Sequence, residues 1–148
     1  MKVVGLSCDS LEEHKGWIKD IEETQNTTMN FPLIADGDRK VAELYGMLHP
    51  AETFNLVLIR CCYVIDPNGK IRLTINYPPS TGRNFDELLR VIDSLQLTDK
   101  HKLATPANWK KGEECIILPT VKNEEAETLF PGFNQVKPYL RYTPDPSK

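Results

Sequence analysis

The chain has 148 residues, of which 40% are hydrophobic and 26% charged, a balance typical of globular domains and not of disordered chains. Its formal net charge of -3 argues against nucleic acid as a partner. No apolar run reaches the length of a membrane span, and we expect the acidic, amphipathic N-terminus not to be a signal peptide.

The four cysteines do not have the regular spacing of a secreted disulfide scaffold, and they fall on apolar, strand-like segments. No C-x-x-C pair and no Gly-rich phosphate loop is present, and the three histidines (His14, His49 and His101) are scattered without metal-ligand spacing. The sequence therefore predicts a cytoplasmic protein with reduced thiols and no cofactor. The cysteines are Cys8, Cys61, Cys62 and Cys115.

The first part of the chain alternates between strand and helix patterns. It opens on an apolar run rich in β-branched residues, the mark of a strand buried on both faces. Ser10 and Glu13 form a capping box at the start of an amphipathic helix. The predicted elements are a strand over 2–8, a helix over 11–23, a strand over 31–35 and a helix that ends at Gly46.

A β-hairpin and a third helix follow. An apolar run over 55–65 is interrupted only by Arg60, and the turn 66–69 joins it to a segment with period-two alternation over 70–77. Asn84 and Glu87 give a second plausible capping box, for a helix with an apolar stripe that ends near residue 97. The order β-α-β-α-β-β-α predicts an α/β fold.

The amino-acid composition changes after this helix. Residues 98–108 are polar and are expected to be a linker, and the short elements beyond it are too few to bury a large core alone. We predict a domain over 1–98 and a small α+β appendage over 99–148. The appendage is expected to contain a strand over 113–118, a helix over 123–130 and an extended stretch over 135–142.

Several segments together resemble the peroxiredoxins, and in particular their 1-Cys branch. The resemblance covers essentially the whole chain, including a C-terminal tail that separates the 1-Cys branch from the two-cysteine branches. The matching segments are 7–17 (S-x-D-S-x-x-x-H-x-x-W), 31–36, 41–48, 77–78, 81–90, 95–98, 104–110, 118–119 and 139–144.

This resemblance implies a thioredoxin-like fold, incomplete at the N-terminus, followed by the 1-Cys peroxiredoxin C-terminal domain. It also implies an antioxidant enzyme that reduces hydrogen peroxide and organic hydroperoxides, with peroxides as substrates and homodimers as the assembly. In such enzymes a thiolate attacks one peroxide oxygen and becomes a sulfenic acid. A neighbouring arginine lowers the pKa of the thiol and aligns the peroxide.

The reacting thiol of the family lies in a P-x-x-x-T-x-x-C segment upstream of the first strand, and this motif does not occur in residues 1–148. Leu58 precedes Cys61 by three residues, Ile59 precedes Cys62, and Gly112 precedes Cys115 in the same way, where the motif requires threonine. We therefore expect this chain itself to be inactive as a peroxidase.

Two arginines match site positions of the family. Arg60 matches the active-site arginine, and the alternative is an edge-strand arginine that reaches to water. Arg83 matches a second arginine near the pocket, and the alternative is an ordinary residue of a first helical turn. Both are predicted to support the reaction and not to carry it.

Two departures from the family concern the surroundings of Arg60. The stretch 53–59 is short and apolar where the family has a charged loop with a Gly-x-Pro-x-Thr element. Asn68 stands at the aligned position of an aspartate that the family's phospholipase members require, so that activity is not expected. His14 shares a helix face with Trp17 and is interpreted as a core or boundary residue.

Three hypotheses follow, in order of preference. The first is a fragment of a peroxiredoxin whose N-terminal part lies outside this sequence. The second is a non-catalytic subunit that pairs with a full-length homologue through the strand 70–77, as a heterodimer, and regulates it. The third is a free-standing thioredoxin-like binding module.

Overall fold

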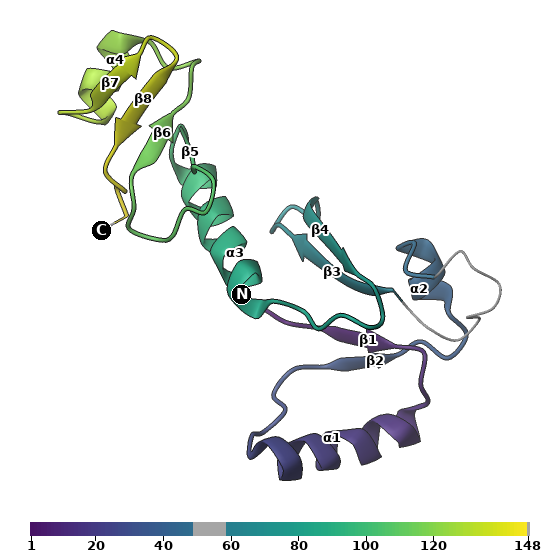
Figure 1. The fold of residues 1–148 in the computed structure, drawn as a ribbon. Helices are drawn as coiled ribbons and strands as arrows, with labels where there is room; N and C mark the ends of the chain where they lie inside the picture. Colours follow the sequence, from purple (N-terminus) through teal and green to yellow (C-terminus); the bar gives the residue numbers. More distant parts are fainter. Residues whose placement is uncertain (49–58, 148) are drawn as a thin grey trace. The chain divides into compact units, whose positions relative to one another are not determined.

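A computed structural model describes residues 1–48 and 59–147 of the chain. It divides the protein into two compact units, which we call the N-terminal unit (1–83) and the C-terminal unit (84–148) (Figure 1). The α3 helix thus begins the second unit. The domain boundary predicted after residue 98 separates two family domains and was not a prediction of compact units. It therefore stays a prediction.

The expected order β-α-β-α-β-β-α is confirmed over the first hundred residues. It is followed by a small sheet and one more helix. The elements are β1 (Gly5–Ser7), α1 (Leu11–Gln25), β2 (Leu33–Ala35), α2 (Lys40–Leu44), β3 (Arg60–Ile65), β4 (Ile71–Tyr77), α3 (Phe85–Lys100), β5 (Leu103–Ala104), β6 (Cys115–Ile117), α4 (Asn123–Leu129), β7 (Asn134–Lys137) and β8 (Leu140–Thr143).

The N-terminal unit opens with a β-α-β crossover. β1 and β2 pair in parallel, with Gly5 opposite Leu33 in the register, and α1 connects them. The predicted capping box at the start of α1 is confirmed. The amide of Glu13 donates to Ser10 Oγ at 3.3 Å, and the Glu13 carboxylate accepts from the Ser10 amide at 2.7 Å.

The start of α2 is held by an aspartate that follows β2. Asp36 is buried, and its carboxylate accepts hydrogen bonds from the amides of Val41 at 3.1 Å and Ala42 at 2.7 Å. These amides belong to the first turn of the helix, which has no partner for them within the helix itself. The α2 helix ends at Leu44, and Gly46 follows with a φ of +65°, which only glycine adopts without strain.

The predicted hairpin is confirmed where the structure describes it. β3 and β4 are antiparallel, Arg60 lies opposite Tyr77, and a bulge falls between Val64 and Ile65. In the turn, the Asp66 carboxylate accepts from the amides of Asn68 at 2.9 Å and Lys70 at 3.0 Å. The part of the predicted apolar run before residue 59, together with His49, lies outside the described residues.

The C-terminal unit packs α3 and α4 with a four-stranded antiparallel sheet of order β5-β6-β8-β7 (Figure 1). The linker predicted over 98–108 is wrong at its start, because α3 continues to Lys100 and β5 pairs with β6. Leu97 and Leu103 on either side of this point are both buried in the core, which holds the polar segment between them in place. The cap predicted at Asn84 is confirmed by its bond from the Glu87 amide at 3.1 Å.

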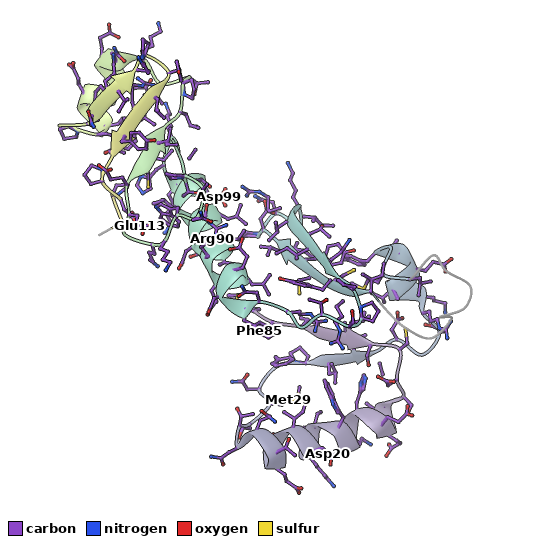
Figure 2. The ribbon with its side chains drawn as sticks, in the orientation of Figure 1. Asp20, Met29, Phe85, Arg90, Asp99 and Glu113 are labelled. Carbon is purple, nitrogen blue, oxygen red and sulfur yellow. The ribbon has the colours of Figure 1, made fainter. Side chains whose placement is uncertain are left out.

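The core of the C-terminal unit is built from side chains of α3, β5, β6 and α4 and of the loops that join or follow them. Trp109 is 1% exposed, and its indole Nε1 donates to the carbonyl oxygen of Glu113 at 3.1 Å. Arg90 lies on α3, where Figure 2 labels it. Its guanidinium donates to the Glu87 carboxylate at 2.5 and 2.8 Å and to the carbonyl oxygen of Trp109 at 3.4 Å. The buried apolar residues are Leu97, Leu103, Trp109, Cys115, Ile117, Val121, Ala126 and Phe130.

Candidate functional site

Arg60 is the first residue of β3, and its side chain is exposed to solvent. Its Nε donates a hydrogen bond to the carbonyl oxygen of Pro79 at 2.8 Å. Pro79 lies in the loop after β4, so this bond closes the end of the hairpin. Among the described residues, Arg60 forms a hydrogen bond only through Nε. Its two terminal nitrogens are therefore available to solvent or to a ligand.

Arg83 lies at the end of the same loop and is also exposed. It is near enough to Cys61 for its positive charge to favour the thiolate of that residue. Arg60 and Cys61 are neighbours in the chain, so both predicted arginines lie at the same end of the hairpin. Their role toward a peroxide stays a prediction.

The thiols themselves are poorly suited to attack a peroxide. Burial raises the pKa of Cys61 above its ordinary value, and the interaction with Tyr63 and the charge of Arg83 only partly oppose this. Burial also raises the pKa of Cys8, with a further contribution from the Asp36 carboxylate. A nucleophilic cysteine needs the opposite shift, because the thiolate is the reacting form.

Cys115 is the most strongly affected thiol. It is fully buried, and this burial, together with the charge of Asp145, raises its pKa to about 11. All four cysteines are free. Cys115 is thus an inert component of the C-terminal core, as the sequence suggested for the buried cysteines.

His14 joins α1 to the end of β1, as expected for a core or boundary histidine. It is 3% exposed, and its Nε2 lies 2.5 Å from Ser7 Oγ. The Ser7–His14 pair is not extended to a Ser-His-Asp triad among the described residues, because His14 Nδ1 is buried without a hydrogen-bond partner there. The pair fastens the helix to the strand.

Two contacts around Cys61 were not predicted from the sequence. The side chain of Tyr63 interacts with this thiol, and its hydroxyl proton is donated to the carbonyl oxygen of Tyr45 at 2.5 Å. The two tyrosine rings meet edge to face, with centroids 5.3 Å apart. The spacing Cys-x-Tyr on a strand places both side chains on one face, and that signal was sufficient to expect the first contact.

Other features of the described residues add no further reactive group. Residues 1–48 and 59–147 contain no cluster of three or more side chains able to hold a metal ion. In the same part of the chain, no helix has the length and apolar character needed to cross a bilayer. The altered stretch before Arg60 lies outside the described residues up to position 58, and Asn68 sits in the exposed turn of the hairpin.

Comparison with known proteins identifies the class to which this fold belongs. The model of the AhpC/TSA family matches residues 1–74, and that of the C-terminal domain of 1-Cys peroxiredoxin matches residues 94–131. The chain superposes on the crystal structure of peroxiredoxin 6 from Arenicola marina with a TM-score of 0.91 and 44% identity, covering 99% of this chain and 71% of that one. The thioredoxin-like α/β fold expected from the sequence is therefore confirmed.

The relatives point to one branch of the class. A 1-Cys peroxiredoxin of Dictyostelium discoideum is 54% identical over 99% of this chain, and peroxiredoxin-6 of Rattus norvegicus is 47% identical over the same share. The chain covers 61% of the first of these proteins and 71% of the second. It belongs to the peroxiredoxin family, in its 1-Cys branch, and spans about three fifths of the length of the Dictyostelium protein.

Proposed function

We propose that this chain serves the thiol-dependent reduction of hydrogen peroxide and organic hydroperoxides, and that its 148 residues supply the arginines and not the reacting thiol. The observation that carries the proposal is the state of its cysteines. None stands in a P-x-x-x-T-x-x-C motif, and burial raises the pKa of Cys8, Cys61 and Cys115. The peroxidatic cysteine is then contributed by a segment outside residues 1–148.

The geometry of Arg60 supports the role proposed for it. In the reaction, a thiolate sulfur bonds to one peroxide oxygen, the O–O bond breaks, and the second oxygen leaves as water or alcohol after taking a proton. Negative charge develops on both oxygens. Arg60 is fixed through Nε by the Pro79 carbonyl, which leaves a planar pair of N–H donors to stabilise that charge.

The first experiment tests the chain as it stands. The reduced protein is mixed with one equivalent of hydrogen peroxide, and peroxide loss and sulfenic acid formation are followed. We expect a rate equal to that of a variant in which all four cysteines are serine. Single-turnover consumption of peroxide that disappears on replacing one cysteine contradicts the proposal.

The second experiment tests the arginine in a longer protein. The chain is joined to the P-x-x-x-T-x-x-C segment of the Dictyostelium relative, and Arg60→Met is compared with Arg72→Met on the neighbouring strand. We expect Arg60→Met to lower the rate constant for peroxide by about a hundredfold or more, as for removal of an oxyanion-stabilising donor. Equal rates for the two variants contradict the role of Arg60.

A second function, that of a regulatory subunit, is favoured by one feature of the hairpin. In the described part of the chain β4 pairs only with β3, so its other edge is open to a strand of another subunit. Co-expression with a full-length 1-Cys homologue is expected to yield a stable heterodimer under this hypothesis. Failure of the two chains to co-purify contradicts it.

The location proposed for the protein is the cytoplasm. Four free cysteines, none of them in a disulfide, suit a reducing compartment. Fractionation of cells that express a tagged version tests this assignment. Recovery of the protein in an oxidising compartment contradicts it.

A further inference from the structure

The turn between β3 and β4 contains the dipeptide Asn68-Gly69, which has no part in the proposed function (Figure 1). Both residues are exposed to solvent. A Cβ atom placed on Gly69 would have no atom of the described residues within 4 Å beyond its chain neighbours, so the backbone there is uncovered in that part of the chain. Water therefore reaches the peptide bond that joins the two residues.

An asparagine followed by glycine carries two groups that react with each other. The backbone nitrogen of the following residue attacks the side-chain amide carbon, and the bond from that carbon to the amide nitrogen breaks. The proton of the attacking nitrogen leaves with the amide group as ammonia. The product is a succinimide ring, which water opens to an aspartate or an isoaspartate. Glycine favours ring closure because it has no side chain to hinder the attack.

The folded turn holds the attacking nitrogen in another interaction. The Gly69 amide donates to the carbonyl oxygen of Asp66 at 3.0 Å, which is the bond that closes a β-turn over 66–69. Pro67 has a fixed φ at the second position of this turn, and Gly69 has a φ of +78° at its end. The Gly69 nitrogen must leave its bond to Asp66 before it attacks Asn68, so the reaction requires the turn to open.

The Asp66 carboxylate stabilises the closed turn. It accepts from the amides of Asn68 at 2.9 Å and Lys70 at 3.0 Å, and its Oδ2 lies 3.5 Å from a terminal nitrogen of Arg72. The bond from the Lys70 amide is the main cause that lowers the pKa of Asp66, so this carboxylate is ionised at neutral pH. An ionised acceptor forms stronger hydrogen bonds than a neutral one. Opening the turn therefore breaks several strong bonds at once.

We propose that Asn68 is a site of spontaneous deamidation and that Asp66 sets the rate of this modification by holding the turn closed. Water is the co-reactant, and the products are ammonia and a carboxylate at position 68. The reactive dipeptide, its solvent exposure and the uncovered Gly69 backbone define the site. The hydrogen bonds of Asp66 define the structural control of its rate.

The two products are expected to change the hairpin in different ways. Aspartate adds a second carboxylate to the turn that already contains Asp66, and like charges repel. Isoaspartate places an additional carbon in the backbone before Gly69, so we expect the bonds from Gly69 and Lys70 to Asp66 not to persist together. The register of Ile71 with β3 is then expected to loosen. An isoaspartyl carboxylate is also the group that repair methyltransferases recognise, so the modified chain is a substrate for that class of enzyme.

The experiment uses the whole 148-residue chain at neutral pH, with mass spectrometry of each asparagine-containing peptide over time. We expect position 68 to gain a carboxylate first. Asn26 is the internal comparison, because it is also exposed but is followed by the β-branched Thr27. Transfer of a methyl group from S-adenosylmethionine by an isoaspartyl methyltransferase detects isoaspartate. Modification that is absent at Asn68, or no faster there than at Asn26, contradicts the proposal.

A matched pair of variants tests the control by Asp66. Asp66→Ala removes the acceptor of two turn amides, whereas Asp20→Ala removes an exposed carboxylate on α1 and is the control. We expect Asn68 to deamidate about tenfold faster in Asp66→Ala than in Asp20→Ala, because the turn opens more often. Equal rates in the two variants contradict the role of Asp66.

A third variant distinguishes opening of the turn from a general loss of folding. Asp66→Asn keeps an acceptor oxygen for both amides and loses only the charge, so the hairpin is expected to form. Its deamidation is expected to be about threefold faster than in Asp20→Ala, an intermediate value. Hydrogen exchange of the Gly69 amide is measured in the same three variants. We expect it to rise in the same order, and a deamidation rate that does not follow this exchange contradicts the proposal.

Discussion

The two units of this chain bury their side chains to very different extents. In the C-terminal unit eight apolar residues form a continuous buried cluster, with Trp109 at its centre. Among the described residues of the N-terminal unit, Ala42 is the only apolar side chain that is buried. Within the described residues, the longer unit therefore has the smaller buried apolar core.

The buried polar groups show the same contrast. Arg141 in the C-terminal unit is 2% exposed and donates to the carbonyl oxygens of Leu118 at 2.9 Å and Val121 at 2.8 Å, and to Asn123 Oδ1 at 2.9 Å. In the N-terminal unit, the buried His14 pairs with Ser7, and the buried Asp36 accepts from the first-turn amides of α2. Hydrogen bonds order the first unit locally, whereas apolar burial stabilises the second as a whole.

The largest difference is expected between the two tryptophans, one in each unit. Trp109→Ala removes the centre of a core and is expected to lower the free energy of unfolding of the C-terminal unit by about 3–5 kcal/mol. Trp17→Ala is its matched control, because Trp17 is 52% exposed, and we expect a cost below about 1 kcal/mol. Urea unfolding followed by circular dichroism measures both, and equal costs contradict the contrast.

A smaller difference is expected between two arginines. Arg141→Met leaves two buried carbonyl oxygens without a donor and is expected to cost about 2–3 kcal/mol. Arg60→Met breaks one bond at an exposed position, and its expected cost is below about 1 kcal/mol. The same unfolding assay compares them. If Arg60→Met lowers the free energy of unfolding as much as Arg141→Met does, the contrast between the two arginines is contradicted.

At alkaline pH, the free energy of unfolding of the C-terminal unit is expected to fall because of one buried thiol. The folded pKa of Cys115, about 11, lies above its ordinary value of 9.0, so the unfolded chain releases this proton first. Stability is then lost as the pH rises above about 9, by about 1.4 kcal/mol at pH 10. The loss is measured by unfolding at pH 8 and pH 10. In Cys115→Ala this part of the pH dependence is expected to disappear, whereas a slope that persists contradicts the assignment.

The smallest effects are expected at two helix caps that use the same chemistry in the two units. Ser10→Ala at α1 and Asn84→Ala at α3 each remove an acceptor for a first-turn amide, at a cost of about 1 kcal/mol. Residue-resolved hydrogen exchange shows whether the loss of stability is confined to the helix or extends through the whole unit. We expect faster exchange only near α1 in the first variant and throughout the C-terminal unit in the second. Uniform exchange changes in both variants contradict the difference in cooperativity.

Much of the local structure was predictable because it is written in short-range signals. The capping box at Ser10, the cap at Asn84 and the hairpin turn at Asp66 each depend on residues within four positions of one another. The linker was mispredicted because a polar composition was read without the flanking leucines. Leu97 and Leu103 lie in one core only once the chain has folded, which a local pattern cannot reveal.

The sequence was sufficient to predict which arginines belong to the candidate site. It was not sufficient to predict which groups these residues contact. Arg60 was singled out as the charged residue in an apolar strand, but its bond to Pro79 spans 19 positions and depends on the path of the loop. The turn over 36–38 was expected to cap the next helix, but the sequence does not show that Asp36 accepts from both first-turn amides. The raised pKa values of Cys8, Cys61 and Cys115 follow from burial, and the sequence predicts burial only for whole strands.

The vicinal pair Cys61–Cys62 offers a practical consequence. Cys61 shares a face with Tyr63 and the end of α2, whereas Cys62 points to the opposite face of the hairpin. Two variants that each retain one of these thiols give spectroscopic labels on either side of a single strand, one residue apart. Such labels report separately on what approaches each face, with no change to the backbone between them.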